Sequence, residues 1–428
     1  MTSDTQTLQA CLARYARRLH AAEGAGTEHH VVSPLGAWLL LALVGPAASG
    51  ADRETLTDVL GCDMDTAARI AAALLEHPHP LVASAAGVWT RPGLQLGPVF
   101  DDWRAGLPGR VESGNLRGQA QLDAWARDHT FGLIDRFPVN VDDPSVYLVL
   151  ATALATRVSW ETPFDLAPAA ELGPDSAWAG QLGQVLKTPH GHGHEQFIAV
   201  TQEAGDVAVH LAQARGGLLV ASVAAAGSVA HGDVLAAAQR IACAYAVDGR
   251  GRFGQQEIAA VPRRALADLP LGEAPLWRVR EETSMDDGDQ FTAVLPAWSA
   301  SNRIDLGQPG LGFGAAARAL AGSDLWEAAQ AAMARYTRIG FEAGAVTGLA
   351  VFLSARPSRR VLAADLRFAH PYAVVAVAID PALSDPPGRG RRQGRGGPGE
   401  PASPWSGIPV FSAWVARPEE ATDDQPPP

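Results

Sequence analysis

Three histidines spaced by glycine, and a glutamate, lie together at residues 190–195 in the sequence HGHGHE. His190, His192, His194 and Glu195 are side chains of the types that bind zinc, and alternate residues of an extended segment point the same way. A metal site also needs fixed geometry, which glycine does not supply, and no second group of ligands accompanies these four. We therefore expect no physiological metal and no cofactor, and we leave incidental binding of nickel or zinc open.

The sequence motifs of common enzyme classes are missing from the chain. It contains no GxSxG nucleophile turn, no GxxxxGK[ST] phosphate loop, no GxGxxG after an expected strand and no HExxH zinc motif. His29, His30, His77 and His79 stand in short polar or proline-rich stretches, which predicts turns or surface positions. We expect no enzyme activity, although a catalytic triad scattered along the chain stays an open alternative.

Arginine carries nearly all of the positive charge. The chain has 34 basic and 46 acidic residues, a formal charge of −12 and a single lysine, Lys187. Net negative charge disfavours non-specific binding to nucleic acid or to an anionic membrane. The arginine bias is typical of a GC-rich genome, and we expect a bacterial source.

Residues 385–404, DPPGRGRRQGRGGPGEPASP, combine proline, glycine and arginine without any apolar period. Such a segment buries too little apolar surface to offset the entropy lost on ordering it. We interpret residues 385–404 as a disordered insertion between two strands, and residues 419–428 as a polar C-terminal tail. Arginine-glycine tracts also bind phosphate, so RNA binding is kept as a distant alternative.

Length and composition predict a folded protein. Of 428 residues, 47% are hydrophobic and 19% are charged, which excludes wholesale disorder and coiled coil. Length alone predicts about three domains. The cysteines, Cys11, Cys62 and Cys243, are odd in number and widely spaced. That spacing excludes a disulfide scaffold and predicts small buried side chains.

We expect neither a leader peptide nor a membrane span. Residues 1–9 are polar, and the uncharged stretch 31–51 is interrupted by prolines and glycines. Only Leu35–Val44 remains as an apolar helix, and it is too short to cross a bilayer. This pattern predicts a cytoplasmic protein without a membrane partner, with an extracellular location as the alternative.

Hydrophobic periodicity predicts a mixture of helices and strands. The expected helices are Leu8–His20, Leu35–Val44, Asp52–Leu60 and Gln121–Arg136. The expected strands are Tyr147–Val158, Gly217–Ala224, Phe291–Leu295, Ala350–Leu353, Tyr372–Ile379 and Val410–Val415. Helices and strands alternate early in the chain, and its later part favours strands.

Several short motifs follow one another in the order found in one protein family. They are Ser33-Pro34-Leu35, Thr55-Leu56, Val59-Leu60-Gly61, Trp125 with Thr130 and Gly132, Leu148–Leu154, Ser159-Trp160, Leu295-Pro296, Trp298, Asp305-Leu306, Leu311-Gly312, His370-Pro371-Tyr372 and Val410-Phe411. In this order they resemble the serpins, a family of serine protease inhibitors. The matches run from about residue 8 to residue 418.

This resemblance implies one α+β domain over residues 1–428, with its core at about residues 8–418, in place of the three that length suggests. It implies the serpin fold: a mixed multi-sheet β core with a large central sheet, about eight or nine helices, and an exposed reactive-centre loop. It also implies a monomer.

The resemblance further implies a suicide-substrate inhibitor of serine proteases. In that mechanism the protease cuts the loop, becomes covalently trapped and is carried along as the loop inserts into the central sheet. The hinge residues would be Glu342, Gly344, Ala345, Val346, Thr347, Gly348, Leu349 and Ala350. Residues 345–354 contain no proline and no charge, as an inserting strand requires. Alternation places Thr347 and Leu349 in the buried row, where Leu349 is larger than usual.

The same comparison implies a scissile bond near a group of arginines. Counting from Gly344 places it between Ser358 and Arg359, after Pro357; a slightly longer register places it after Arg359 or Arg360. Arginine before the bond suits a trypsin-like protease, whose acidic pocket pairs with guanidinium, whereas Ser358 suits an elastase-like or subtilisin-like protease. The alternative is that these arginines only keep an exposed loop soluble.

By resemblance, Ser33, Thr152 and Trp160 belong to the region that controls opening of the central sheet. The sequence departs from the family there and nearby: Thr152 replaces the usual Asn, Gly36 a frequent second Ser, Phe131 an Asn, and Ala413 a Gly. The departures at Thr152 and Gly36, together with Leu349, motivate the alternative function, a non-inhibitory binding protein with a serpin fold, although the inhibitor stays the favoured prediction.

Overall fold

The computed structural model describes residues 3–23, 28–189, 192–247, 261–284, 288–322, 326–341, 359–379 and 403–423. Its α-helices within those residues are α1 Ser3–Ala22, α2 Pro34–Val44, α3 Gly50–Leu60, α4 Met64–Glu76, α5 Pro98–Ala105, α6 Gln119–His129, α7 His231–Val247 and α8 Phe313–Ala321. Three short 3-10 helices cover Gly45–Ala47, Ala169–Leu172 and Leu266–Asp268.

The described strands form four sheets. One six-stranded sheet has the order β1 His30–Val32, β19 Ile408–Val415, β18 Tyr372–Ala378, β10 Leu218–Ala224, β9 Gly205–Ala214, β8 His194–Thr201. The other six-stranded sheet has the order β11 Gly272–Glu273, β12 Trp277–Ser284, β17 Arg359–Arg367, β13 Gln290–Leu295, β7 Gln184–Lys187, β6 Asp165–Pro168.

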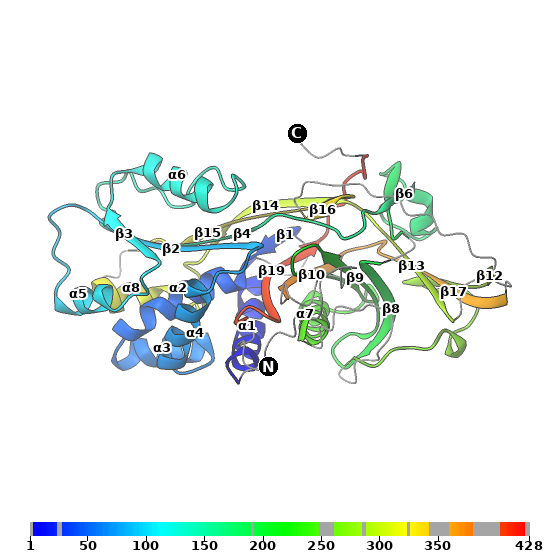
Figure 1. Ribbon diagram of the computed structural model, residues 1–428, viewed down its shortest axis with the longest axis horizontal. Helices are drawn as coiled ribbons and strands as arrows, with labels where there is room; N and C mark the ends of the chain where they lie inside the picture. The colour runs from blue at the N-terminus through cyan, green and yellow to red at the C-terminus, as the bar shows by residue number, and fades with distance from the viewer. Residues whose placement is uncertain are drawn as a thin grey trace, which may run out of the picture.

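The remaining two sheets lie beside each other along the long axis of the molecule (Figure 1). The four-stranded sheet has the order β14 Trp298–Asp305, β15 Ala329–Tyr336, β16 Gly340–Phe341, β5 Val158–Ser159. The three-stranded sheet has the order β3 Val111–Asn115, β2 Val82–Thr90, β4 Leu148–Thr156. Helix α6 covers one face of β2 and β4, while α2, α3 and α4 lie on the other side (Figure 1).

Helix α2 lies at the centre of the largest hydrophobic core. All of its residues except Leu40 are buried, because α2 packs against α1, α4, α8, β4 and β19 at once. Its start follows from local chemistry: Pro34 occupies the first turn, and Ser33 Oγ accepts a hydrogen bond from Gly36 N–H (3.3 Å). The apolar helix expected at Leu35–Val44 is confirmed.

The long helix expected at Gln121–Arg136 is wrong in its extent, because α6 ends at His129. Phe131 has φ 53° and Gly132 has φ 75°, and an α-helix cannot continue through left-handed residues. The expected strand at Tyr147–Val158 is split into β4 and β5. The expected strand at Ala350–Leu353 lies outside the described residues.

Phe131 is the only non-glycine residue with a positive φ among those described. Its ring is 44% exposed, so little packing offsets the strain of a bulky side chain there. We expect Phe131→Asn to raise the free energy of unfolding by about 1 kcal/mol, because asparagine tolerates this conformation. Denaturant unfolding measures the change. Phe131→Ala keeps the strained backbone and should not raise the free energy of unfolding. An equal rise in both variants would contradict this account.

One histidine in each of the two pairs that were expected at turns or at the surface, His29/His30 and His77/His79, is buried in the structure. His30 is 2% exposed and His79 is 4% exposed, so the surface prediction is wrong for these two. His79 Nε2 donates to the carbonyl of Ile379 (2.9 Å), a partner far away in the sequence. Local polarity did not indicate these contacts, since they form only when distant strands come together.

The start of the expected C-terminal tail lies against the body of the protein. Glu419 N–H donates to the carbonyl of Ala297 (2.7 Å), and the Glu420 carboxylate accepts from the backbone N–H groups of Gly183 (2.8 Å) and Gln184 (2.6 Å). Ala421 is buried. Of the expected insertion at residues 385–404, all but Ser403 and Pro404 lies outside the described residues.

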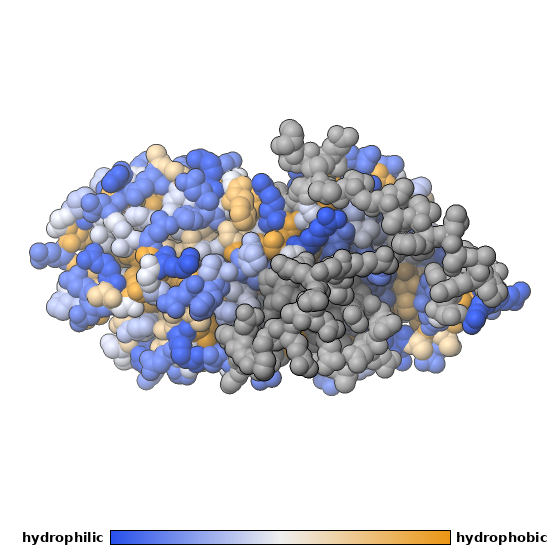
Figure 2. Space-filling model, in the orientation of Figure 1, coloured by the Kyte–Doolittle hydropathy of each residue, from blue (hydrophilic) through white to orange (hydrophobic). Residues whose placement is uncertain are grey.

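Among the described residues on the face drawn in Figure 2, hydrophobic side chains form separate patches between hydrophilic ones. Large hydrophobic side chains that are exposed, among the described residues, are Leu94, Val99, Phe131, Leu271 and Trp326. Scattered exposure of this kind is ordinary for a folded protein.

Candidate functional site

Strands β4 and β15 run side by side without pairing (Figure 1). Among the described strands, β4 pairs with β2, and β15 pairs with β14 and with the short β16. The chain passes directly from β4 of the three-stranded sheet into β5 of the four-stranded sheet, where β5 pairs with β16 through Ser159 opposite Gly340 and Val158 opposite Phe341. Each of β4 and β15 therefore presents one edge of backbone N–H and C=O groups toward the other strand.

A cavity of about 600 Å³ lies between these edges and extends to α2, α6 and α8. Leu40 and Leu41 line it from α2, Leu150 from β4, and Phe313 and Leu320 from α8. Most of the lining is apolar, so a segment entering the space would bury side chains there while its backbone meets two strand edges. We call the space between β4 and β15 the slot.

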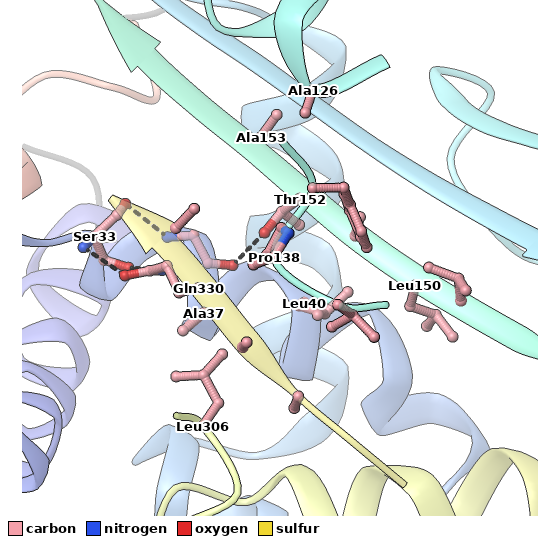
Figure 3. Close-up of a pocket in the computed structure, with 18 of the residues that line it drawn as sticks. Ser33, Ala37, Leu40, Ala126, Pro138, Leu150, Thr152, Ala153, Leu306 and Gln330 are labelled. Carbon is pink, nitrogen blue, oxygen red and sulfur yellow. Dashed lines mark hydrogen bonds between the residues drawn. The ribbon is translucent and has the colours of Figure 1, made fainter. Parts of the chain in front are cut away.

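Ser33 and Gln330 form a reciprocal clamp at one side of the slot (Figure 3). Gln330 Oε1 accepts from Ser33 N–H (2.9 Å), and Gln330 Nε2 donates to the carbonyl of Ser33 (2.9 Å). Ser33 Oγ also donates to the carbonyl of Val410 (3.0 Å). The first residue before α2 thereby joins β15 to β19.

Thr152 makes the matching contact from the other side of the slot. Its Oγ1 donates to the carbonyl of Gly36 in α2 (2.7 Å). A Cβ at position 36 would lie 3.2 Å from Leu154 Cδ1 and 3.2 Å from Ser33 Oγ, which is tighter than normal packing. A larger residue at position 36 would therefore push the Leu154 and Ser33 side chains by a few tenths of an ångström. The structure thus brings two of the expected sheet-opening residues, Ser33 and Thr152, to opposite sides of one slot (Figure 3).

Gln330 also belongs to the residues at the slot, but the sequence analysis did not predict a role for it. It stands in AQAAMARY, a stretch whose alanines give no sign of a hydrogen-bonding role. We expect Gln330→Ala to lower the free energy of unfolding by about 1–3 kcal/mol, because the N–H of Ser33 loses its acceptor and the carbonyl of Ser33 keeps only the longer bond from Ala37 N–H (3.4 Å). Denaturant unfolding measures the loss. Gln330→Glu keeps the size and one acceptor but sets a second acceptor against the carbonyl of Ser33, so a full rescue by Glu would contradict the reciprocal clamp.

Trp160 lies just beyond the junction of the two sheets. It is 1% exposed, its Nε1–H donates to the carbonyl of Thr337 (3.0 Å), and its backbone N–H donates to the carbonyl of Ile339 (3.1 Å). Its ring packs against Tyr336 at a centroid distance of 5.0 Å. Trp160 therefore holds the turn between β15 and β16 against β5, the position where the slot closes.

The hinge and loop residues lie outside the described residues, from Glu342 through Ser358. They include Gly344, Ala345, Val346, Thr347, Gly348, Leu349, Ala350 and Pro357. Arg359 and Arg360 are described, and they begin β17, opposite Ser284 and Thr283 of β12. Arg360 is exposed, with Nη1 3.7 Å from a carboxylate oxygen of Glu281.

The histidine-rich segment does not assemble a metal site within the described residues. His192 is exposed, and its carbonyl accepts from Thr162 Oγ1 (2.7 Å). His194 is buried, donates through Nε2 to the carbonyl of Thr162 (2.7 Å) and contacts His210 (3.0 Å). Glu195, the next residue, forms an ion pair with Arg263. His190 lies outside the described residues.

The described residues contain neither a cluster of metal ligands nor a helix that could cross a membrane. No three His, Cys, Asp or Glu side chains there lie close enough to hold one metal ion. None of the helices there combines the length and the apolar character that a bilayer span needs.

No family model matches the chain, but curated plant proteins are similar to part of it. Serpin-Z12 of Oryza sativa subsp. japonica is 32% identical over 167 residues, which is 36% of this chain and 39% of that protein. Serpin-Z7 of Hordeum vulgare is 28% identical over 188 residues, 39% of this chain and 47% of that protein. The chain is thus matched to less than half the length of these relatives. They are plant proteins, which does not support the expectation of a bacterial source.

Solved serpin structures match nearly the whole chain. Serpin48 of the insect Tenebrio molitor has a TM-score of 0.56 and 14% identity, covering 97% of this chain and 99% of that one. The thermophilic serpin tengpin in its native state has a TM-score of 0.59 and 12% identity, covering 96% and 94%. Human thyroxine-binding globulin has a TM-score of 0.61 and 13% identity, covering 97% and 100%. At these identities the likeness concerns the fold, and it confirms the α+β serpin architecture.

Proposed function

We propose that this chain, which has the serpin fold and resembles plant serpins in sequence, inhibits serine endopeptidases as a suicide substrate. The observation that carries the proposal is the direction of β16. Strand β16 is antiparallel to β15 and to β5, and β5 continues the line of β4. A chain that continues straight from β16 therefore enters the slot antiparallel to both edges, which is the geometry that extends a ladder on both sides.

The register of β16 supports an inserted strand with a defined inner face. Phe341 lies opposite Val158 on one side and Tyr336 on the other. Continued without a bulge, this register sets Thr347 opposite Thr152 and Gln330. Directly opposed residues share a face of the sheet, and Thr152 faces α2. Thr347 and its alternate neighbours would then face the cavity.

Leu349 fits this arrangement better than its size alone suggests. In the same register it lies opposite Leu150, which lines the cavity of about 600 Å³. An enlarged side chain is costly where it enters a filled core. Here it would enter space that is already open, so Leu349 does not argue against insertion.

The proposed partner is a serine protease: a subtilisin-like enzyme for the proposed scissile bond Ser358–Arg359, or a trypsin-like enzyme if the bond lies after Arg359 or Arg360. Arg359 and Arg360 already belong to β17 and pair with β12. A protease must bind its substrate as a free extended segment, so a bond inside this ladder is less accessible than one before it. We propose a monomer that acts in the cytoplasm, with an extracellular location as the alternative.

A protease panel tests the inhibitor. Incubation with subtilisin, or with trypsin if the bond lies after Arg359 or Arg360, should give an SDS-stable covalent complex, and the cleaved chain should unfold at a higher Tm because the slot is filled. Mass spectrometry locates the bond. Thr347→Arg, which would bring a charge to the inner face, should be cut without forming the complex, whereas Thr347→Ser should behave like the unaltered chain. Cleavage of the unaltered chain with neither complex nor thermal gain would contradict inhibition.

That contrary result would favour the second candidate, a binding protein without inhibitory activity. Two similar proteins point to it by name: a rice serpin-Z9 named as non-inhibitory, 29% identical over 181 residues, and human thyroxine-binding globulin complexed with its ligand. Retained binding of a partner after the loop is cut would distinguish this function from inhibition.

A further inference from the structure

Two cysteines that are far apart in the sequence lie together where α1 crosses the end of α3. Cys11 is in the middle of α1 and is 2% exposed, and Cys62 is half-buried in the turn between α3 and α4. A Cβ built on Gly61, the neighbour of Cys62, would lie 3.4 Å from Cys11 Sγ. The Cys62 thiol is hydrogen-bonded to the sulfur of Cys11.

The backbone on both sides of Cys62 is held by helix caps. Gly61 ends α3 in the left-handed conformation (φ 78°), with its N–H donating to the carbonyl of Thr57 (2.9 Å). Asp63 begins α4, with Oδ1 accepting from Thr66 N–H (2.8 Å). Cys62 is therefore presented toward α1 from a fixed position, so joining it to Cys11 does not require a loop to reorganise.

The surroundings also favour ionisation of one of the two thiols. The hydrogen bond from Cys62, followed by the charge of Arg14, lowers the pKa of Cys11. Arg14 is held in place by Asp58, with Nη2 donating to its carbonyl (3.3 Å) and lying 3.6 Å from its carboxylate. Cys243, by contrast, stands apart in α7, and burial raises the pKa of its thiol to about 12.

We propose that Cys11 and Cys62 form a reversible intramolecular disulfide that fastens α1 to the turn between α3 and α4. This inference is independent of the proposed inhibitory function. The sequence predicted only small buried side chains for the cysteines. An odd number of cysteines does not prevent two of them from pairing, and Cys243 is the one left over.

The oxidant is a low-molecular-weight disulfide such as oxidised glutathione. Cys11 first loses its proton to solvent. The Cys62 sulfur, which is the more accessible, then attacks one sulfur of the oxidant as its own proton passes to the Cys11 thiolate, and the first small thiolate leaves. Cys11 then loses that proton to solvent and attacks Cys62 Sγ, which breaks the mixed disulfide and releases the second small thiolate. Two electrons pass from the pair to the oxidant, and the two thiolates take up the two protons.

Counting free thiols tests the proposal on the full chain. After treatment with oxidised glutathione, unfolding and alkylation with a maleimide, mass spectrometry should find one modified cysteine, Cys243, where the reduced chain shows all 3 cysteines modified. The oxidised chain should remain monomeric on a non-reducing gel. Its Tm should rise, because the cross-link closes a long loop in the unfolded state, and dithiothreitol should reverse both changes.

Two variants make the outcome decisive. Cys243→Ser should keep the loss of two thiols and the rise in Tm. Cys62→Ser, a change at a half-buried turn position, should keep Cys11 and Cys243 alkylatable and show no change in Tm on oxidation. Three modified cysteines after oxidation, a glutathione adduct that persists on Cys62, or a disulfide-linked dimer would each overturn the proposal.

Discussion

Trp160→Ala is expected to lower the free energy of unfolding by about 3–5 kcal/mol. The indole is almost fully buried and packs against Phe164 and Tyr336. Its removal leaves a cavity at the junction of the two sheets and deprives the carbonyl of Thr337 of its donor. Both effects act at the turn that joins β15 to β16.

Denaturant unfolding of the purified variants measures the effect. Trp160→Phe keeps most of the packing and loses the hydrogen bond, so we expect a smaller loss of about 1–3 kcal/mol. Trp326→Ala removes an indole that is 37% exposed and serves as the matched control. If Trp160→Ala and Trp326→Ala lower the free energy of unfolding by the same amount, Trp160 does not hold the junction in the way described.

Acid is expected to destabilise the protein between pH 6.5 and pH 4. Burial lowers the pKa of His194 from 6.5 to about 4, and burial, followed by the nearby His194, lowers the pKa of His210 well below its usual value. A folded pKa below the unfolded one means that the unfolded chain binds protons first. The stabilising contribution is therefore complete above pH 6.5 and is lost as the pH falls toward 4, at about 3 kcal/mol for His194.

A second buried pair acts in the same direction. His30 Nδ1–H donates to the carbonyl of Glu28 (2.9 Å), so its Nε2 accepts from His20 Nδ1–H (2.7 Å), and His20 Nε2 accepts from the hydroxyl of Ser412 (2.7 Å). Each ring is neutral in this chain of hydrogen bonds, and burial lowers the pKa of both histidines. Protonating either ring removes an acceptor.

Unfolding free energies measured at several pH values between 7 and 4 test this expectation. His194→Gln should flatten the dependence on pH, because an amide can donate to the carbonyl of Thr162 and accept from His210 without titrating. His192→Gln, at an exposed position two residues away, should leave the slope unchanged. An identical slope in the His194 variant would contradict the assignment.

Much of the local structure could be predicted because its causes are local. The apolar run at Leu35–Val44, bounded by Ser33-Pro34 and by Gly45-Pro46, contains its own start and stop signals. Gly61 likewise marks the end of α3. The extent of α6 was missed because Phe131, a residue that rarely adopts positive φ, does so here. No propensity scale indicates that exception.

The ordered series of motifs in the sequence was by itself sufficient to indicate the serpin fold and the region of the slot, including Ser33, Thr152 and Trp160. Only the tertiary structure revealed the partners across that slot and elsewhere: Gln330 for Ser33, His210 for His194 and Cys62 for Cys11. The physical reason is that helix caps and apolar periods depend on neighbours in the chain, whereas these contacts join residues from separate elements. The residues that flank a single glutamine, histidine or cysteine in the sequence do not indicate which distant residue it contacts in the folded protein.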